Sequence, residues 1–414
     1  MSQEQYFLGK RGDFPILNEK IRGQDLVYFD SAATSHKPMC VIDSLVNYYT
    51  KLNSNVHRGD HFLSQKSTDF YEEARKSVAE LLSTNIENIS FNAGATAGMN
   101  QVAYGLKHIF SPGDEIVITE MEHHSNTLIW IELAKELNLV LRVIPITEDF
   151  ELDYKKAEEL ITEKTKLVAF SHMSNVLGTI NDVPRLSSLA HSHNALTLVD
   201  GCQGIVHTKV DVNELGCDFY VFSAHKLYGP TGVGVLYGRD LSMLKPMFYG
   251  GGQIESVNLS LKENGALGEV TYLDAPHHLE SGTPNIADII AFNSALKYLE
   301  ELDSKRLEEW DFELGNYFLE KVKELGDDFE LFGKNIMEKR GNVFAFRYLD
   351  THPSDICTFL DQFGIATRGG LHCAQPLHDK LGVSGTIRVS FCFYNTKKEI
   401  DYLIESLKKI KDMI

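Results

Sequence analysis

The sequence predicts an α/β fold in which a large domain, built on a mostly parallel seven-stranded sheet, is followed by a smaller α+β domain. Between residues 89 and 223, short apolar runs alternate with helix-length amphipathic stretches, which is the pattern of successive strand and helix units. Beyond residue 290 the pattern changes to longer helices and isolated strands. We therefore expect three parts: an N-terminal segment (1–20), a large domain (21–290) and a small C-terminal domain (291–414).

In the large domain, each short apolar run predicts a buried strand and each amphipathic stretch predicts a helix that covers the sheet. The expected strands are 89–92, 115–119, 140–144, 167–171, 196–199 and 219–223. The expected helices are 97–108, 126–137, 154–162 and 184–192. A further strand over 232–238 should be antiparallel, because the turn at 228–231 is too short for a crossover helix.

Downstream of this sheet the periodicity breaks. Three consecutive glycines at 250–252 and a polar stretch at 262–280 predict a long loop. A helical run from 286 to about 325 then leads into the small domain. Its expected elements are strands at 342–346, 365–368 and 386–391 and a charged amphipathic helix at 397–414.

Composition narrows the function classes. Hydrophobic residues make up 43% and charged residues 24%, as in globular proteins, and the net charge of −18 has the wrong sign for binding nucleic acid or anionic membranes. No stretch approaches the roughly 18 apolar residues of a membrane span, and the start lacks a secretory signal pattern. We expect a cytoplasmic protein. The six cysteines form no C-x-x-C pair, so no metal site is expected.

Two strand ends carry the most informative polar residues. Asp200 follows one predicted strand and Lys226 follows the next, and ligands of open α/β sheets bind at the carboxyl ends of strands. A lysine amine and a carboxylate suit pyridoxal 5′-phosphate (PLP), which needs a Schiff-base lysine and an acid beside its ring nitrogen. Alone, Asp200 would cap a turn and Lys226 would be a surface amine. The Ser-x-His-Lys context before Gly-Pro-Thr-Gly favours the cofactor.

A phosphate site is expected at the glycine-rich turn 92–98, which joins a strand to a helix. The first turn of a helix presents unpaired N–H groups and the positive end of its dipole to an anion. The candidate phosphate-binding residues are Gly94, Ala95, Thr96, Ser223 and His225.

Several motifs in order make the chain resemble the Suf-type cysteine desulfurases, which are fold-type I, class V aminotransferase-like PLP enzymes. The resemblance rests on Asp-Gly-x-Gln at 200–203, Ser-x-His-Lys at 223–226, Met-Glu-His-His at 121–124, Ser-Asn-Val-Leu-Gly-Thr at 174–179 and Arg-Gly-Gly-Leu-His-Cys-Ala at 368–374. It extends from about residue 28 to residue 396.

For the cofactor, the resemblance implies that Lys226 forms the Schiff base, Asp200 pairs with the ring nitrogen and Gln203 bonds the ring oxygen. It further implies that His123 stacks on the ring and moves protons, and that Asn175 contacts cofactor or substrate. Ala95 stands where the family usually has Thr, which removes one side-chain contact to the phosphate and leaves the backbone N–H.

For the substrate, Arg388 matches the family's carboxylate-binding arginine, and a planar guanidinium suits a carboxylate. Arg368, His57 and Arg58 are further basic candidates near the entrance. The resemblance also implies that Thr283 reaches the phosphate of a neighbouring subunit, and hence a homodimer.

Cys373 determines which PLP reaction is expected. A thiolate favoured by nearby Arg368 and His372 could take the sulfur of L-cysteine, release L-alanine and keep a persulfide for a Suf-type acceptor protein in iron–sulfur cluster assembly. The other five cysteines are expected to be buried and inert. Gly369 and Leu371 depart from the Thr or Ala and the His common in that branch, which leaves acceptor and substrate preference open.

Two alternatives stay open from the sequence. The first is a selenocysteine lyase or another class V aminotransferase or β-lyase, which needs Lys226 and Asp200 without Cys373. The second is a catalytically silent scaffold that binds a partner on its acidic surface.

Overall fold

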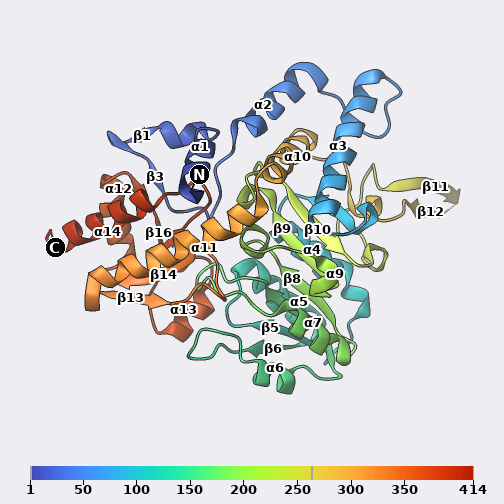
Figure 1. Cartoon of the computed structure of the whole chain (residues 1–414). Helices are drawn as coiled ribbons and strands as arrows, with labels where there is room; N and C mark the ends of the chain where they lie inside the picture. Colours follow the sequence, from blue (N-terminus) through green and yellow to red (C-terminus); the bar gives the residue numbers. More distant parts are fainter. Residues whose placement is uncertain (1, 263, 414) are drawn as a thin grey trace.

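A seven-stranded sheet forms the centre of the larger lobe in the computed structural model, which describes residues 2–262 and 264–413 (Figure 1). Only β10 runs antiparallel to its neighbours, as its short connection requires. The predicted strands are confirmed to within two residues at each end. In spatial order they are β4 (Ile89–Asn92), β10 (Gly234–Gly238), β9 (Phe219–Ser223), β8 (Leu196–Asp200), β7 (Thr165–Ser171), β5 (Glu115–Thr119) and β6 (Val140–Ile144).

Both faces of this sheet are buried. In β9, Phe219 and Val221 belong to one apolar core, and Tyr220 and Phe222 belong to the other. Alternate residues of a strand point to opposite faces, so a continuous apolar run is what a doubly covered strand needs. The helices of this lobe are α2 (Met39–Asn47), α3 (Phe62–Leu81), α4 (Ala95–Gly105), α5 (Leu128–Leu137), α6 (Tyr154–Leu160), α7 (Val183–Ser192), α8 (Gly204–His207), α9 (Val212–Leu215) and α10 (Ile286–Glu300).

The smaller lobe is an antiparallel sheet of four strands covered by helices (Figure 1). Its strand order is β13 (Phe329–Phe332), β14 (Val343–Tyr348), β17 (Thr386–Ser390) and β16 (Arg368–Gly370). Its helices are α11 (Ser304–Lys321), α12 (Pro353–Gln362), α13 (Gln375–Leu381) and α14 (Lys397–Lys411).

The N-terminal part of the chain is fastened to the smaller lobe. Helix α1 (Gln3–Arg11) contacts α11, and β3 (Val27–Tyr28) pairs in parallel with β15 (Ile365–Ala366). Beyond β3, the N–H of Ser390 donates to the carbonyl of Phe29 at 2.8 Å, and the N–H of Ala32 donates to Ser390 Oγ at 2.8 Å. These bonds place Asp30 beside strand β17. A separate small hairpin, β1 (Lys20–Ile21) with β2 (Gln24–Asp25), precedes them.

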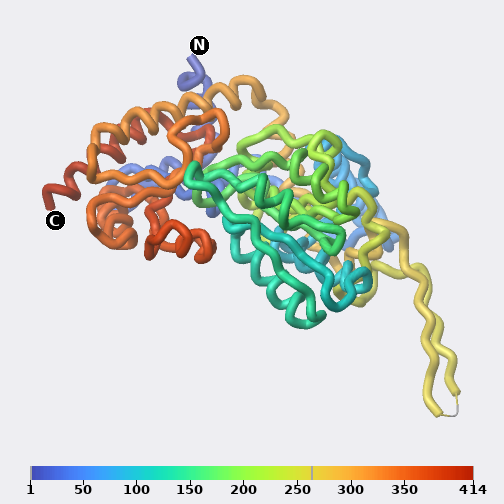
Figure 2. The backbone as a smooth tube through the Cα atoms, turned by 90° about the horizontal axis from the view of Figure 1, so that it is seen from below, coloured from blue at the N-terminus to red at the C-terminus, as the bar shows by residue number. Residues whose placement is uncertain are grey.

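The predicted loop is wrong where two strands form instead, over 254–262 and 265–272. Strands β11 (Ile254–Lys262) and β12 (Gly265–Tyr272) form a long antiparallel hairpin that projects from the body (Figure 2). Nearly every residue of both strands is exposed, including Leu259 at 72%. Val257, Leu259 and Leu261 alternate with polar residues along β11, which is a strand signal that the sequence analysis missed.

The predicted helical run from 286 to 325 is also wrong as a single element. It divides into α10 and α11, because the side chain of Asp303 accepts the N–H of Arg306 and caps a new helix. The expected strand at 365–368 divides into β15 and β16, which belong to different sheets. Strand β13 was not predicted, since it is short and half exposed.

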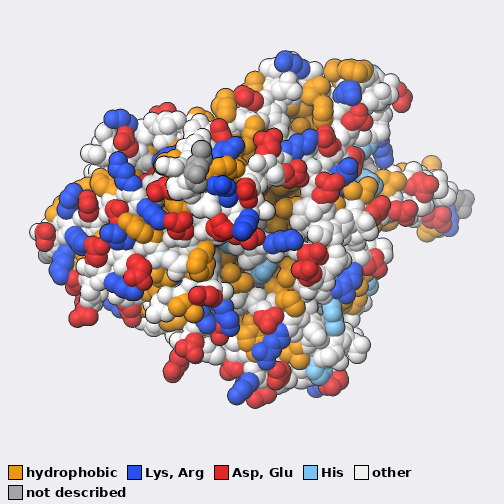
Figure 3. All heavy atoms as spheres, viewed as in Figure 1, with side chains coloured by type: hydrophobic (Ala, Val, Ile, Leu, Met, Phe, Trp, Pro, Cys, Tyr) orange, Lys and Arg blue, Asp and Glu red, His pale blue; other side chains and the backbone are white. Residues whose placement is uncertain are grey.

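None of the described helices is long and apolar enough to cross a membrane. On the face shown in Figure 3, acidic and basic side chains are interspersed around a hollow, and apolar side chains are visible inside the hollow.

Candidate active site

A cavity of about 270 Å³ opens at the carboxyl ends of the central strands and collects most of the predicted site residues. The larger lobe contributes the ends of β8 and β9 and the turns that follow β4, β5 and β7, and the smaller lobe contributes β16, β17 and the segment between β16 and α13. The predicted residues that line it are Ala95, Thr96, His123, Asn175, Asp200, Gln203, Ser223, His225, Lys226, Arg368, Cys373 and Arg388.

The floor of the cavity is the turn after β8. Asp200 is 6% exposed, and its Oδ1 accepts the N–H of Cys202 at 3.0 Å. Gln203 Nε2 donates to the carbonyl of Ala32 at 2.8 Å, which ties the turn to the N-terminal segment. A Cβ on Gly201 would lie 2.0 Å from the Tyr220 ring, so only glycine allows the turn to pass so close to β9. The carboxylate is thereby fixed at the strand end.

Lys226 closes a single turn of 3-10 helix, Ala224–Lys226, that continues β9. The carbonyl of His225 accepts hydrogen bonds from Lys37 Nζ at 2.9 Å and from the N–H of Ser35 at 3.1 Å. These bonds hold the turn that presents the Lys226 amine to the cavity. Burial and then the charge of Lys226 lower the pKa of His225 to about 4.

His123 lies past β5, at the start of the short helix His124–Asn126. Burial, followed by the charge of Lys226, lowers the pKa of His123 to about 4, so its imidazole is neutral at pH 7. Its Nδ1 lies 3.1 Å from the N–H of Ser125 and accepts from it, which assigns the ring hydrogen to Nε2. The ring can therefore donate from Nε2 toward a ligand.

Glu122 is a buried acid next to His123 in the chain that the sequence analysis did not single out. It is 2% exposed and accepts from Asn126 Nδ2 at 2.6 Å, Thr119 Oγ1 at 2.5 Å and the N–H of Ser171 at 2.9 Å. Burial raises its pKa to about 7. A carboxylate three residues past a buried strand, inside a motif already noted, was the available signal.

The turn that the sequence predicts as the phosphate site joins β4 to α4. The N–H of Ala95, at the start of α4, donates to Ser223 Oγ at 2.8 Å, and Thr96 Oγ1 lies 2.8 Å from Ser125 Oγ. Gly94 has a φ of 142°, which a residue with a side chain rarely adopts. Hydroxyls and backbone N–H groups thus gather at a helix N-terminus, where an anion is favoured.

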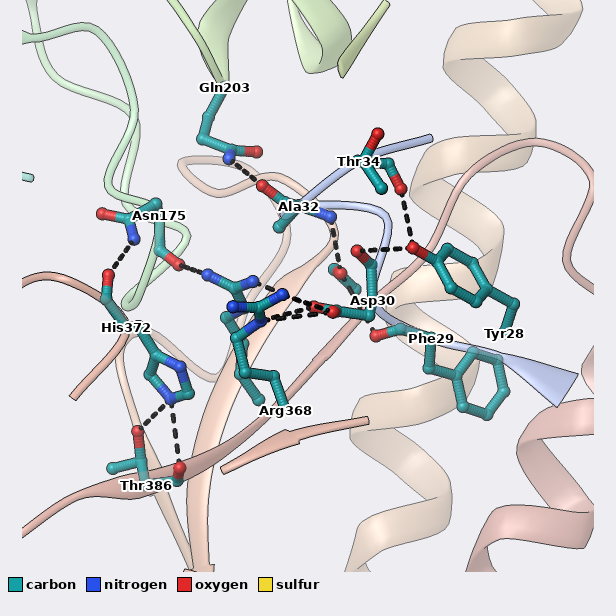
Figure 4. A network of polar contacts seen from close by, with 12 residues as sticks. Tyr28, Phe29, Asp30, Ala32, Thr34, Asn175, Gln203, Arg368, His372 and Thr386 are labelled. Carbon is teal, nitrogen blue, oxygen red and sulfur yellow. Dashed lines mark hydrogen bonds and ion pairs between the residues drawn. The ribbon is translucent and has the colours of Figure 1, made fainter. Parts of the chain in front are cut away.

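Two arginines of the smaller lobe meet one acid, Asp30, which the sequence analysis did not single out (Figure 4). Arg388 is 3% exposed, and its Nη1 donates to the carbonyl of Asn175 at 3.1 Å. Its Nη2 donates to Asp30 Oδ1 at 3.1 Å, and Arg368 Nη2 donates to Asp30 Oδ2 at 2.9 Å. Arg388 Nε is buried and has no partner among the described residues, so it is free to bind a ligand.

Cys373 is exposed and has a φ of 55°, in the segment between β16 and α13. Its carbonyl accepts the N–H of His124 at 2.6 Å, and the N–H of Gln375 donates to His124 Nε2 at 3.0 Å. The carbonyl of His372 accepts from Asn175 Nδ2 at 2.9 Å. The larger lobe therefore holds this segment on both sides of the thiol.

The expectation that the other cysteines are buried is confirmed for Cys202, Cys217 and Cys392 and is wrong for Cys40, which is exposed. Cys357 is partly buried.

We expect His124→Leu to loosen the Cys373 segment, because leucine cannot accept the N–H of Gln375. Exchange of that amide with deuterium should become about fivefold faster, as for the loss of roughly 1 kcal/mol. His124→Gln, whose side-chain oxygen can accept, should keep the slow exchange. Equal rates in all three proteins would contradict this role.

Three of the residues predicted for the entrance and for the neighbouring subunit lie outside the cavity within one chain. His57 Nε2 lies 2.8 Å from Glu72 Oε1, and Arg58 Nη2 donates to the carbonyl of Ile254 at 3.1 Å. Thr283 is exposed and lines a separate cavity with Asn92 and other residues. Among residues 2–262 and 264–413, no group of three or more His, Cys, Asp or Glu side chains could hold a metal ion.

Buried histidines make acid stability a testable property. Burial lowers the pKa of His36, His123, His172 and His225 from 6.5 to about 4. Between pH 6.5 and 4 the unfolded chain binds protons that the folded chain does not, so the free energy of unfolding should fall as pH falls through this window. Burial also raises the pKa of the Glu122 and Glu399 carboxyls, and these two groups act in the opposite direction. Urea unfolding at pH 7, 6 and 5 measures the effect, and the decline should be smaller in His36→Gln; a constant free energy would contradict it.

Fold and site together define a PLP enzyme, and the comparison with family models agrees: the aminotransferase class-V model matches residues 27–403. The chain belongs to this family and, within it, to the cysteine desulfurases. A protein of Halalkalibacterium halodurans named "Probable cysteine desulfurase" is 44% identical over 404 residues, which are 96% of each chain. A protein of Staphylococcus aureus with the same name is 44% identical over 97% of this chain and 95% of its own.

Solved structures are similar in the same way. The apo cysteine desulfurase of Thermococcus onnurineus has a TM-score of 0.90 and 37% identity, with 98% of each chain covered. The cysteine desulfurase CsdA of Escherichia coli has a TM-score of 0.88 and 35% identity, with 100% of this chain and 99% of that chain covered.

The residues present fit the cofactor. The cavity joins an amine (Lys226), a carboxylate fixed at a strand end (Asp200) and a neutral imidazole (His123). Hydroxyl and N–H donors stand at the N-terminus of α4, as a phosphate requires. An amine, an acid for the ring nitrogen and an anion site are the three features that PLP needs.

Proposed function

We propose that the protein takes the sulfur of L-cysteine, releases L-alanine and keeps the sulfur as a persulfide on Cys373. The observation that supports this most is the shared cavity: Cys373 and Arg388 of the smaller lobe line the same space as Lys226 and Asp200. A PLP enzyme that only exchanged amino groups would not need an exposed thiol at this place.

Each cofactor residue has a separate task. When bound, PLP supplies an electron sink for the carbon atoms of the amino acid. Lys226 would hold it covalently, Asp200 would keep its ring nitrogen protonated, and Gln203 would bond its ring oxygen. Thr96, Ser223 and His225 would bind its phosphate, and the N–H of Ala95 would hold the Ser223 hydroxyl in place. His123 would cover the ring face and hold a proton at Nε2.

Arg388 would bind the substrate's carboxylate. Its Nε is buried and has no partner among the described residues, and its Nη1 and Nη2 are already oriented by Asn175 and Asp30. A planar guanidinium can bind both carboxylate oxygens, which fixes the amino acid with its sulfur toward Cys373.

The sulfur transfer balances as L-cysteine plus the Cys373 thiol giving L-alanine plus the Cys373 persulfide. The thiolate attacks the substrate's sulfur, an S–S bond forms, and the C–S bond breaks with its electron pair left on carbon. The carbon takes up a proton to become the methyl group of alanine. No external oxidant or reductant is needed.

The finer assignment is to a Suf-type enzyme that passes its sulfur to an acceptor protein for iron–sulfur cluster assembly in the cytoplasm. This assignment is supported by the short segment between Cys373 and Arg388. The thiol is exposed, while the backbone carbonyl of Cys373 is held by a hydrogen bond from His124. We further propose a homodimer, in which Thr283, His57 and Arg58 serve the neighbouring subunit's site. The exposed apolar side chains of the β11–β12 hairpin are surface that a second copy would cover.

Rates of alanine formation with L-cysteine, L-selenocysteine and cysteine sulfinate, measured side by side, test the reaction. We expect the protein to turn over L-cysteine when a thiol acceptor is present. Replacing Cys373 should slow turnover of L-cysteine more than turnover of the other two substrates. Turnover of selenocysteine alone, without need for Cys373, would indicate a selenocysteine lyase instead. Purified protein that gains no absorbance with PLP would indicate a silent scaffold.

A further inference from the structure

Asp30 is the one described acid that pairs with the two arginines of the cavity. Its Oδ1 accepts from Arg388 Nη2 at 3.1 Å and from Arg368 Nε at 3.1 Å. Its Oδ2 accepts from Arg368 Nη2 at 2.9 Å and from Nε at 3.2 Å. Figure 4 shows the Asp30 carboxylate joined to Arg368 by dashed lines. The contact joins the N-terminal segment to β16 and β17.

The backbone leaves Asp30 little freedom. It forms a bridge with Ser390 of β17, and the neighbouring Phe29 and Ala32 bond to the backbone and side chain of the same serine. The carboxylate is therefore positioned by the fold before any ligand arrives. Arg388 is held between this carboxylate and the carbonyl of Asn175, which comes from the larger lobe.

The Asp30 carboxylate stabilises the positive charges of Arg388 and Arg368. Burial lowers the pKa of Arg388 and Asp30 raises it, so the carboxylate stabilises a guanidinium that is 3% exposed. The hydrogen bond to Asp30 likewise raises the pKa of Arg368, whose side chain is 48% exposed. Without Asp30, two neighbouring cations would face the cavity with no acid partner among the described residues.

We propose that Asp30 is a positioning residue of the reaction: an internal carboxylate that orients Arg388 and Arg368 and competes with the substrate's own carboxylate for their charge. The inference rests on the proposed function, in which Arg388 binds that carboxylate. A competing internal anion weakens ground-state binding, while fixed guanidinium geometry serves the reacting complex, so the two effects can be separated kinetically.

Asp30→Asn should therefore change KM and kcat in the same direction. In the variant the substrate supplies the counterion that Arg388 lacks, so the KM for L-cysteine should fall at least threefold. The guanidinium groups lose their orientation, so kcat should fall at least tenfold. Asp30→Glu, which keeps the charge, should return KM to within twofold of the parent.

The control is Asp218→Asn, which changes a buried acid outside the cavity that is bonded to Thr197. Its KM should stay within twofold of the parent value. A raised KM, or unchanged constants, in Asp30→Asn would overturn the proposal.

A second measurement does not depend on the reaction. Iodoacetate and iodoacetamide both alkylate thiols, but only iodoacetate carries a carboxylate. The alkylation rate with iodoacetate divided by the rate with iodoacetamide therefore reports the positive charge around a thiol. Peptide mass spectrometry of the holoenzyme gives this ratio at Cys373. The ratio should rise at least threefold in Asp30→Asn at Cys373 and stay constant at exposed Cys40 in the same sample. Should Asp30→Asn fail to fold, Asp30→Ser is measured in its place, with the same expectation.

The two measurements separate the two claims. An unchanged alkylation ratio in a protein that desulfurates cysteine would overturn the role of Asp30 and leave the proposed function intact. A parent enzyme that forms no alanine from L-cysteine would overturn the proposed function, whatever the ratio.

Discussion

Replacing Lys226 by alanine should lower alanine formation from L-cysteine at least about 10⁴-fold, because the variant loses both the covalent hold on the cofactor and an amine that can move protons. Lys226 ends the turn after β9 and faces the cavity with Asp200 and His123. Steady-state kinetics of alanine release, together with the visible absorbance of the purified protein, measures the loss.

The matched control is Lys297→Ala, which removes a lysine of α10 that pairs with Glu73 away from the cavity. Its rate should stay within about twofold of the parent, as for an ordinary surface ion pair. Parent-like turnover by Lys226→Ala, or borohydride labelling of a different lysine, would remove Lys226 from the site.

Replacing Cys373 by alanine should lower turnover of L-cysteine on the order of 10³-fold, since the sulfur loses its nucleophile. The absorbance of bound cofactor should stay the same, because Cys373 belongs to the smaller lobe and no proposed cofactor contact passes through it. The variant Cys40→Ala removes the other exposed cysteine and should behave as the parent. Full activity of Cys373→Ala with a thiol acceptor would contradict the persulfide route.

The local sequence pattern predicted which residues of the larger lobe meet in the cavity. Asp200, Ser223 and Lys226 end or follow buried strands, and the strand ends of a parallel sheet meet at one edge. His123 follows another strand end of the same sheet. Their meeting in one cavity is therefore a consequence of strand order, which apolar runs and connection lengths reveal.

The contacts between lobes could not be predicted in this way. Asp30 is separated from Arg368 by 338 positions and from Arg388 by 358, and His124 from Gln375 by 251. No periodicity relates such residues, and an aspartate in a loop looks like a turn residue. Thr283, His57 and Arg58 lie outside the cavity of a single chain, so their proposed roles depend on a second copy.

The most direct test is mass spectrometry of the holoenzyme after incubation with L-cysteine and no acceptor. The peptide that contains Cys373 should gain about 32 Da, the mass of one sulfur atom, and lose it again when a thiol is added. The same peptide with alanine at position 373 should gain nothing. Sulfur found on another cysteine, or on none while alanine is released, would contradict the account.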